Sequence, residues 1–271
     1  MEFIKIIALG IIEGITEFLP ISSTGHLVVS EKLLHFKDKS SLFTVVIQLG
    51  AILAAAWYFR RDLAHIIKSL ISRDIPMINF AKSVIIGLLP AGIIGVLVEK
   101  TVGIPDSPVL ISASLILGGV VLWVVENHYH IPDSTDGHVN YPAITMKRSL
   151  AIGFAQALAI IPGVSRSGAT IVAGMLSGLD RKTATVFSFY LSIPIMLAAS
   201  ALKLKDGTPA LQNITGGTTG LALGVGVSFI TAFLVVKWLL HYVQKHNFKP
   251  FAYYRIGVGS LILLLVLTNK L

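Results

Sequence analysis

Long apolar segments recur along this chain and constrain its fold more than any other feature. Hydrophobic residues make up 54% of the 271 residues and charged residues only 13%, whereas a soluble domain carries roughly 25% charged residues. A membrane span needs about 20 mostly apolar residues. Six segments meet or approach that length: Ser41–Phe59, Ser83–Val98, Pro108–Val125, Ala184–Leu202, Ile214–Leu240 and Pro250–Thr268. The sequence therefore predicts an all-α integral membrane protein with six transmembrane helices.

Two further apolar segments, residues 3–34 and 149–179, are interrupted by polar residues, proline and glycine. Each is typical of a helix, a polar break and a second short helix. Irregular backbone at membrane depth is tolerated only where it is buried in protein or lines a wet cavity. We therefore expect two re-entrant helical hairpins in addition to the six spans.

An internal repeat relates the two broken segments. A shift of 143 residues superimposes five polar or glycine positions: Gly10 on Gly153, Glu13 on Gln156, Ser22 on Ser165, Thr24 on Ser167 and Gly25 on Gly168. Further along, a shift of 137 places Gly87 on Gly224. Each half then holds one hairpin and three spans, and an odd number of spans inverts the second half relative to the first. We predict one membrane domain over residues 1–271, with repeats at about 1–126 and 147–271.

The net charge of +8 does not indicate nucleic-acid binding, because the basic residues lie in short loops between apolar segments. Such loops act as topology signals and contact anionic lipid head groups. If residues 60–82 are cytoplasmic, more Lys and Arg residues fall inside than outside. Both termini, and the entrance of the first hairpin, would then face the exterior. The absence of cysteine excludes disulfides, thiol catalysis and zinc–thiolate sites.

The first hairpin carries the motif EGITEFLPISSTGH. Glu13 and Glu17 are four residues apart and share a helix face. Two carboxylates inside an apolar segment need a cation between them, and Mg²⁺ or Ca²⁺ takes such oxygen ligands. The alternatives are that one glutamate pairs with an arginine while the other faces an aqueous mouth, or that the pair performs acid–base chemistry.

Hydroxyls and a histidine follow at the break of this motif. Ser22, Ser23 and Thr24 offer a nucleophile and hydrogen-bond donors, and His26 offers a base within one turn. Ser22 is equally typical of a helix cap. His26 on its own could be an interfacial or core histidine.

The second hairpin carries the motif PGVSRSGAT. Ser165 and Ser167 can cap the helix that follows the break, and Gly168 lets the backbone approach a ligand closely. The free N–H groups of that helix start form an anion site, and Arg166 adds a planar cation suited to phosphate oxygens. The alternative is a structural salt bridge from Arg166 to Glu13 or Glu17. Together the two motifs suit hydrolysis of the phosphoanhydride of a lipid.

Both motifs, with the terminal stretch PFAYYRIGVG, resemble the bacterial undecaprenyl pyrophosphate phosphatases, also called bacitracin resistance proteins. The resemblance covers the whole length. It implies a multi-pass inner-membrane hydrolase that removes the terminal phosphate of undecaprenyl diphosphate, recycles the carrier lipid for peptidoglycan synthesis, and has its site towards the periplasm. Partners would be the lipid substrate, membrane lipids and, through the shared substrate, bacitracin, while a homodimer is left open.

The resemblance also implies roles for single residues. Glu13 and Glu17 match the essential acidic pair, Ser22, Ser23 and His26 match the hydroxyl–histidine cluster, and Ser165, Arg166 and Thr170 match the phosphate-binding motif. We expect Ser23 to attack the terminal phosphorus with His26 as its base, Glu13 and Glu17 to hold the metal, and the second motif, with Ser22 and Thr24, to bind phosphate. A phosphohistidine at His26 and a metal-bound water are competing hypotheses.

Two other classes remain to be weighed. Another broad class of lipid phosphatases places a histidine and an aspartate shortly after its serine–arginine pair, and residues 167–176 contain neither. A lipid-carrier transporter or flippase would use the same inverted-repeat architecture. Arg255 is a weak candidate for a diphosphate contact, and the neighbouring Tyr253 and Tyr254 make an interfacial anchor equally reasonable.

Overall fold

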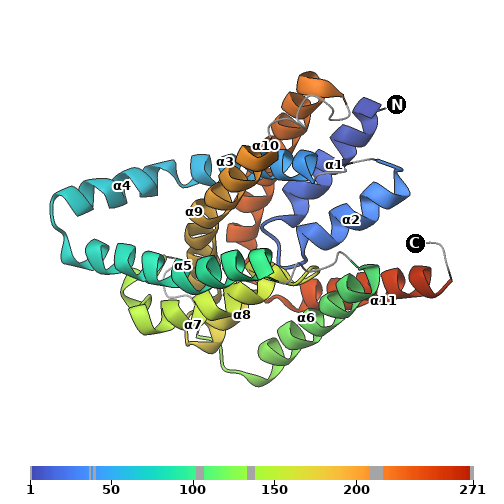
Figure 1. The fold of residues 1–271 in the computed structure, drawn as a ribbon. Helices are drawn as coiled ribbons and strands as arrows, with labels where there is room; N and C mark the ends of the chain where they lie inside the picture. Colours follow the sequence, from blue (N-terminus) through green and yellow to red (C-terminus); the bar gives the residue numbers. More distant parts are fainter. Residues whose placement is uncertain are drawn as a thin grey trace.

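The chain folds into a bundle of helices (Figure 1). The computed structural model describes residues 2–36, 38, 41–101, 107–132, 138–207 and 216–268, and all regular elements in these ranges are helical. The α-helices are α1 (Glu2–Thr16), α2 (Ser23–Leu33), α3 (Leu42–Tyr58), α4 (Arg60–Ile71), α5 (Ile75–Thr101), α6 (Pro108–His128), α7 (Met146–Ala157), α8 (Arg166–Leu176), α9 (Arg181–Gly207), α10 (Gly217–Tyr242) and α11 (Lys249–Leu267). Two short 3₁₀ helices are η2 (Tyr141–Ala143) and η3 (Leu158–Ile160).

Within the described ranges, α5, α6, α9, α10 and α11 are each long and apolar enough to cross a membrane. The predicted span Ser41–Phe59 corresponds to α3, which qualifies only together with α4, and these two helices meet at a bend of 64°. The described residues therefore contain five candidate spans, or six if the bent pair is one span. Ile214 and Thr215, at the start of another predicted span, lie outside the described residues.

The segment between the first two predicted spans is more helical than the sequence predicts. The sequence places residues 60–82 in a connection between two predicted spans, the second of which begins at Ser83. The structure instead forms α4 and begins α5 at Ile75. Charged residues such as Arg60 and Arg61 lower the hydropathy of this segment, but α4 still has an apolar face whose Ile66 joins the core.

Each polar motif covers the break between two packed helices and extends into at least one of them. The first break separates α1 from α2, the second separates α7 from α8, and the helices of each pair contact each other. The pairs also pack crosswise on the long helices, because α1 lies against α10 of the second half and α7 lies against α5 of the first.

Glycines make this crosswise packing close. A Cβ at Gly10 would meet the backbone oxygen of Gly224, and a Cβ at Gly153 would overlap that of Gly87. These are the glycines that the 143- and 137-residue shifts superimpose. Larger side chains at these positions would push the helices apart.

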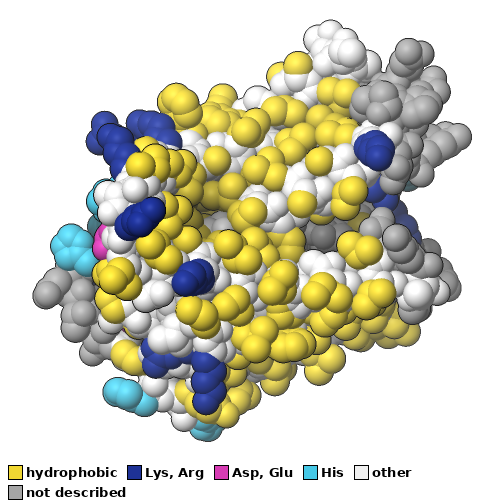
Figure 2. Space-filling view, turned by 60° about the vertical axis from the view of Figure 1, so that its left-hand side comes forward, with side chains coloured by type: hydrophobic (Ala, Val, Ile, Leu, Met, Phe, Trp, Pro, Cys, Tyr) yellow, Lys and Arg dark blue, Asp and Glu magenta, His cyan; other side chains and the backbone are white. Residues whose placement is uncertain are grey.

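Aromatic rings fill the centre of the bundle. Phe18, within the first break, packs edge-on against Phe189, which also contacts Phe59, and Phe59 in turn contacts Tyr190. The exterior is also apolar: Figure 2 shows a broad surface of hydrophobic side chains, with Lys and Arg gathered mainly towards one side. An apolar outer surface suits contact with lipid rather than water.

Candidate active site

The two breaks meet in the interior of the protein. The hydroxyl of Ser167 donates to the backbone oxygen of Leu19 at 2.8 Å, and the Ser165 hydroxyl donates to the same oxygen at 3.5 Å. The Ser165 and Ser167 hydroxyls also lie 3.0 Å apart. Side chains of the second motif thus satisfy a carbonyl that the first break leaves outside a helix. This contact fixes the two motifs against each other.

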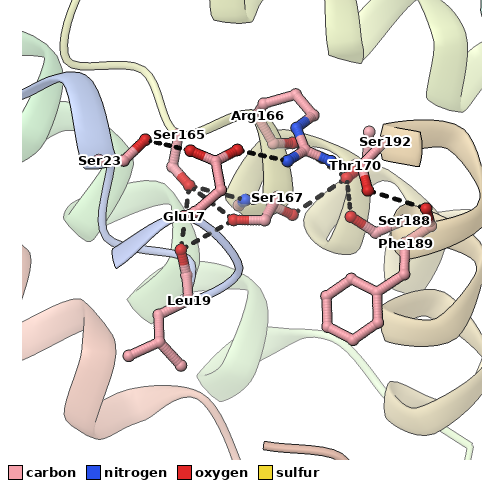
Figure 3. Close-up of polar contacts among 11 residues, drawn as sticks. Glu17, Leu19, Ser23, Ser165, Arg166, Ser167, Thr170, Ser188, Phe189 and Ser192 are labelled. Atoms are coloured by element: carbon pink, nitrogen blue, oxygen red, sulfur yellow. Dashed lines mark hydrogen bonds and ion pairs between the residues drawn. The ribbon is translucent and has the colours of Figure 1, made fainter. Parts of the chain in front are cut away.

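Glu17 is the centre of the polar cluster (Figure 3). Its Oε1 accepts a hydrogen bond from Nη2 of Arg166 at 2.7 Å, and its Oε2 accepts one from the Ser23 hydroxyl at 2.6 Å. Glu17 is 6% exposed, so the ion pair with Arg166 is largely buried. The salt bridge considered as an alternative for Arg166 is therefore present, and it involves one of the two terminal guanidinium nitrogens, Nη2.

Matching serine caps begin α2 and α8. The Ser22 hydroxyl accepts the Gly25 N–H at 3.4 Å, and the Ser165 hydroxyl accepts the Gly168 N–H at 3.0 Å. The repeat superimposes these two pairs. Ser22 adopts a φ of 72°, which is uncommon for a residue with a Cβ and is found preferentially where a functional site over-determines the backbone.

His26 does not contact Ser23 in the way that a general base would require. Its Nδ1 lies 2.7 Å from the backbone oxygen of Ser22, and its Nε2 lies 2.8 Å from the Tyr254 hydroxyl. The imidazole also stacks on the Tyr254 ring, with centroids 5.6 Å apart. The expected Ser23–His26 pair is therefore replaced by a Ser23–Glu17 pair, because the turn of α2 directs His26 towards α11.

Arg255 joins both breaks. Its guanidinium donates to the backbone oxygen of Pro20 at 3.1 Å and to that of Gly163 at 3.4 Å. Further bonds reach the α6 carbonyls of Ser114 (3.1 Å) and Leu115 (3.3 Å). Arg255 is 3% exposed, so it is neither an interfacial anchor nor placed to contact a diphosphate. Sequence reasoning missed this role because no local pattern shows that the Arg255 side chain, on α11, reaches both breaks.

A cavity of about 290 Å³ opens beside the Glu17–Arg166 pair. Its polar wall comes from both motifs and from two glutamines: Glu17, Ser22, Ser23, Thr24, Gln48, Gln156, Ser165 and Arg166. Its apolar wall comes from α5, α9 and the second break: Ala91, Ala159, Ile160, Val164, Ile195, Met196 and Ala199. Sequence reasoning did not identify Gln48, which lies on α3 outside both motifs.

Comparison with known proteins places the chain in a family. The family model described as "Bacitracin resistance protein BacA" matches residues 6–261. The chain belongs to this family. Undecaprenyl-diphosphatase 1 of Paraburkholderia xenovorans is 46% identical over 263 residues, covering 96% of this chain and 94% of the relative. Undecaprenyl-diphosphatase 3 of Acinetobacter baylyi is 44% identical over 273 residues, covering 98% and 99%. The match over nearly the full length agrees with the resemblance seen in the sequence.

Two residues that were expected to bind phosphate in this member of the bacitracin resistance protein family, Ser167 and Thr170, do not line the cavity. Thr170 is 1% exposed and donates to the Ser188 hydroxyl at 2.7 Å, which joins α8 to α9. Ser167 is also buried and is occupied with Leu19. Neither residue lines the cavity, so their contacts in this structure support the scaffold around Arg166.

Several buried polar atoms near the cavity have no hydrogen-bond partner among the described residues. They are Oε1 of Glu13, Nη1 of Arg166 and both polar atoms of the Gln156 carboxamide. The described residues contain no group of three or more His, Asp or Glu side chains arranged for a metal ion. Both oxygens of Glu17 accept hydrogen bonds, which leaves the buried Oε1 of Glu13 as the oxygen best suited to a cation.

Proposed function

We propose that this protein hydrolyses undecaprenyl diphosphate to undecaprenyl phosphate and inorganic phosphate. The observation that carries the proposal is the state of Arg166, whose Nη2 is held by Glu17 while its buried Nη1 has no partner among the described residues. A guanidinium fixed on one side and open on the other is prepared for an anionic ligand. The relatives named undecaprenyl-diphosphatase favour hydrolysis over transport.

The cavity supports a lipid substrate. A diphosphate would occupy the polar wall beside Arg166, Ser165 and Thr24, while an isoprenoid chain would run along the apolar wall. Ala91 of α5 and Ala199 of α9 keep that wall open because their side chains are small. Ligand sites of this kind combine an apolar wall with a few polar groups that fix orientation.

The geometry supports Ser23 as the nucleophile and Glu17 as its base. As Ser23 Oγ attacks the terminal phosphorus, Glu17 Oε2 takes the hydroxyl proton across the 2.6 Å hydrogen bond. The Ser23–phosphorus bond forms, and the bond from phosphorus to the bridging oxygen breaks. Glu17 passes the proton to the departing undecaprenyl phosphate. Arg166 neutralises the charge on the phosphoryl oxygens during this step.

A second step would release phosphate. Water attacks the phosphoserine, and Glu17 takes one of its protons. The bond from phosphorus to Ser23 Oγ breaks, and Glu17 returns the proton to that oxygen. The hydroxyl group of the water leaves as part of inorganic phosphate, so the enzyme is regenerated. His26, held by Ser22 and Tyr254, positions the start of α2 in this scheme.

A divalent cation, Mg²⁺ or Ca²⁺, would fit beside Glu13 and Glu17. The unpartnered carboxylate oxygen of Glu13 is the type of ligand that hard cations prefer. The cation would supply positive charge against the diphosphate. Glu13 is 1% exposed, and a buried carboxylate needs such compensation.

We also infer an inverted repeat with two re-entrant hairpins in the bacterial inner membrane. The crosswise contacts of α1 with α10 and of α7 with α5 support the repeat. The excess of basic residues in one set of loops supports a cavity that faces the periplasm. Since the chain has no cysteine, single cysteines at Thr24 and Arg73 can report sidedness. An impermeant maleimide added to intact spheroplasts should label the first and not the second, and the reverse would exclude this orientation.

The experiment that tests the function is phosphate release by purified protein in detergent. With undecaprenyl diphosphate and Mg²⁺, the wild type should release inorganic phosphate, and Glu17→Gln should lower kcat by about 10²- to 10⁴-fold, the usual contribution of a general base. Glu2→Gln, at an exposed carboxylate at the start of α1, is the control. Absence of release by the wild type, or full activity of Glu17→Gln, would overturn the proposal. Chelation that leaves the rate unchanged would remove the cation from it.

A further inference from the structure

Gln156 is a buried polar residue at the cavity that the mechanism above does not use. It occupies the last turn of α7, immediately before the second break. The residue is 3% exposed and forms part of the cavity wall with Glu17 and Arg166. Neither its Nε2 nor its Oε1 has a hydrogen-bond partner among the described residues.

This state is unfavourable in a resting protein. A buried polar group without a partner costs about 1–3 kcal/mol, and buried carboxamides normally find partners. Nearby hydroxyls show that partners can be supplied here, since Ser165, Ser167 and Thr170 are all satisfied by protein groups. An uncompensated polar group at a ligand cavity is typical of a group that is satisfied by the ligand.

The charge on the polar wall of the cavity indicates which kind of ligand Gln156 would bind. Arg166 Nη1 is the other unpartnered buried donor that lines this cavity. A phosphate group between them would accept from the guanidinium and from the carboxamide N–H. Being neutral, the amide would not repel the phosphate, whereas a glutamate at this position would. The internal repeat superimposes Gln156 on Glu13, so the two inverted motifs would place an anion-binding amide and a carboxylate at equivalent positions.

We propose that Gln156 is a substrate-binding residue whose carboxamide donates to the terminal phosphate of the diphosphate, beside Arg166. This inference rests on the proposed function for its substrate. It adds a binding residue that lies outside both sequence motifs. The carboxamide would orient the phosphorus towards Ser23 in addition to contributing affinity.

The test compares Gln156→Met with Gln244→Met. Methionine has a similar volume and no strong hydrogen-bonding group. Gln244 lies in the turn after α10 and bonds the Leu240 carbonyl, so its variant controls for the chemical change. We expect Gln156→Met to melt at or above the wild-type temperature and to lose at least about tenfold in kcat/KM, the effect of one lost hydrogen bond to a charged group. Gln156→Glu should be less active still.

A second readout separates this inference from the proposed function. Inorganic pyrophosphate should raise the melting temperature of the wild type and of Gln244→Met, and should raise that of Gln156→Met much less. This binding measurement needs no turnover, so it decides the role of Gln156 even if the wild type releases no phosphate from the lipid. Activity within twofold of wild type, or an undiminished pyrophosphate effect in Gln156→Met, would overturn the inference. A lower melting temperature in that variant would assign Gln156 to the scaffold instead.

Discussion

Replacement of Arg255 by methionine should destabilise the protein by releasing the two breaks from each other. In the native protein the guanidinium bonds the break carbonyls of Pro20 and Gly163 and two carbonyls inside α6. The carbonyls of α6 lie within a helix, whereas those of the breaks lie between helices and lose their donor when Arg255 is removed. Each unsatisfied buried carbonyl costs about 1–3 kcal/mol, so two of them cost about 2–6 kcal/mol.

This magnitude is measurable by thermal unfolding in detergent. A loss of 1 kcal/mol lowers Tm by about 2–4 °C in a chain of this approximate size, so Arg255→Met should melt roughly 10 °C below the wild type. Activity should fall as well, because Glu17 lies in the first break and Arg166 directly follows the second. Gly118→Ala offers an independent test, since its Cβ would collide with the Arg255 guanidinium. Gly226→Ala, whose Cβ meets nothing within 4 Å, is the matched control.

One combination of Tm and activity would refute the scaffold role of Arg255. If Arg255→Met retained the wild-type Tm and lost activity, Arg255 would act on the substrate rather than on the scaffold. Gly118→Ala should then also leave Tm unchanged.

Three further predictions concern other parts of the structure. Glu126→Gln removes the ion pair of the buried Glu126 carboxylate with Arg181, whose Nε lies 3.0 Å away. Tm should fall by an amount equivalent to about 3–5 kcal/mol, while the KM of the folded enzyme stays unchanged. An altered KM would contradict this prediction. Ala199→Trp should narrow the cavity at its apolar wall and lower kcat/KM for undecaprenyl diphosphate at least about tenfold. The kcat/KM for a short prenyl diphosphate should not fall. Equal losses for the two substrates would argue against a lipid path along this wall. Tyr254→Phe removes the hydrogen bond to His26, which is worth about 1 kcal/mol. It should therefore lower kcat only a few-fold. A loss as large as that of Glu17→Gln would instead indicate a catalytic role for His26.

Local patterns in the sequence predicted much of this fold. Apolar segments of sufficient length became α5, α6, α9, α10 and α11, because burial in lipid and helix formation depend on the same residues. A helix cap was one interpretation of Ser22, and Ser165 was one of two cap candidates at the second break; both serines cap helices in the structure. The start of α5 was misplaced because hydropathy registers charge, while a helix can continue through charged residues on one exposed face.

The residues of the candidate site could be predicted from the sequence, but the hydrogen-bond partner of the Ser23 hydroxyl could not. Both motifs identified Glu17, Ser23 and Arg166 from residue type alone, and the structure brings these three together. Which acceptor Ser23 would find depended on the path of the chain through a non-helical break, for which no periodic rule exists. Arg255 and Gln48 contribute from distant helices, and only the tertiary packing reveals their neighbours.

The central claim is that Glu17 of the first motif and Arg166 of the second form one catalytic unit. A double-mutant cycle on kcat/KM for phosphate release tests it most directly, using Glu17→Gln, Arg166→Gln and the combined variant. Residues that act as a unit show strongly non-additive losses. The account predicts that each single variant loses at least about 10²-fold and that the combined variant is no more than a few-fold worse than the poorer single one. Losses that multiply across the two sites would contradict it.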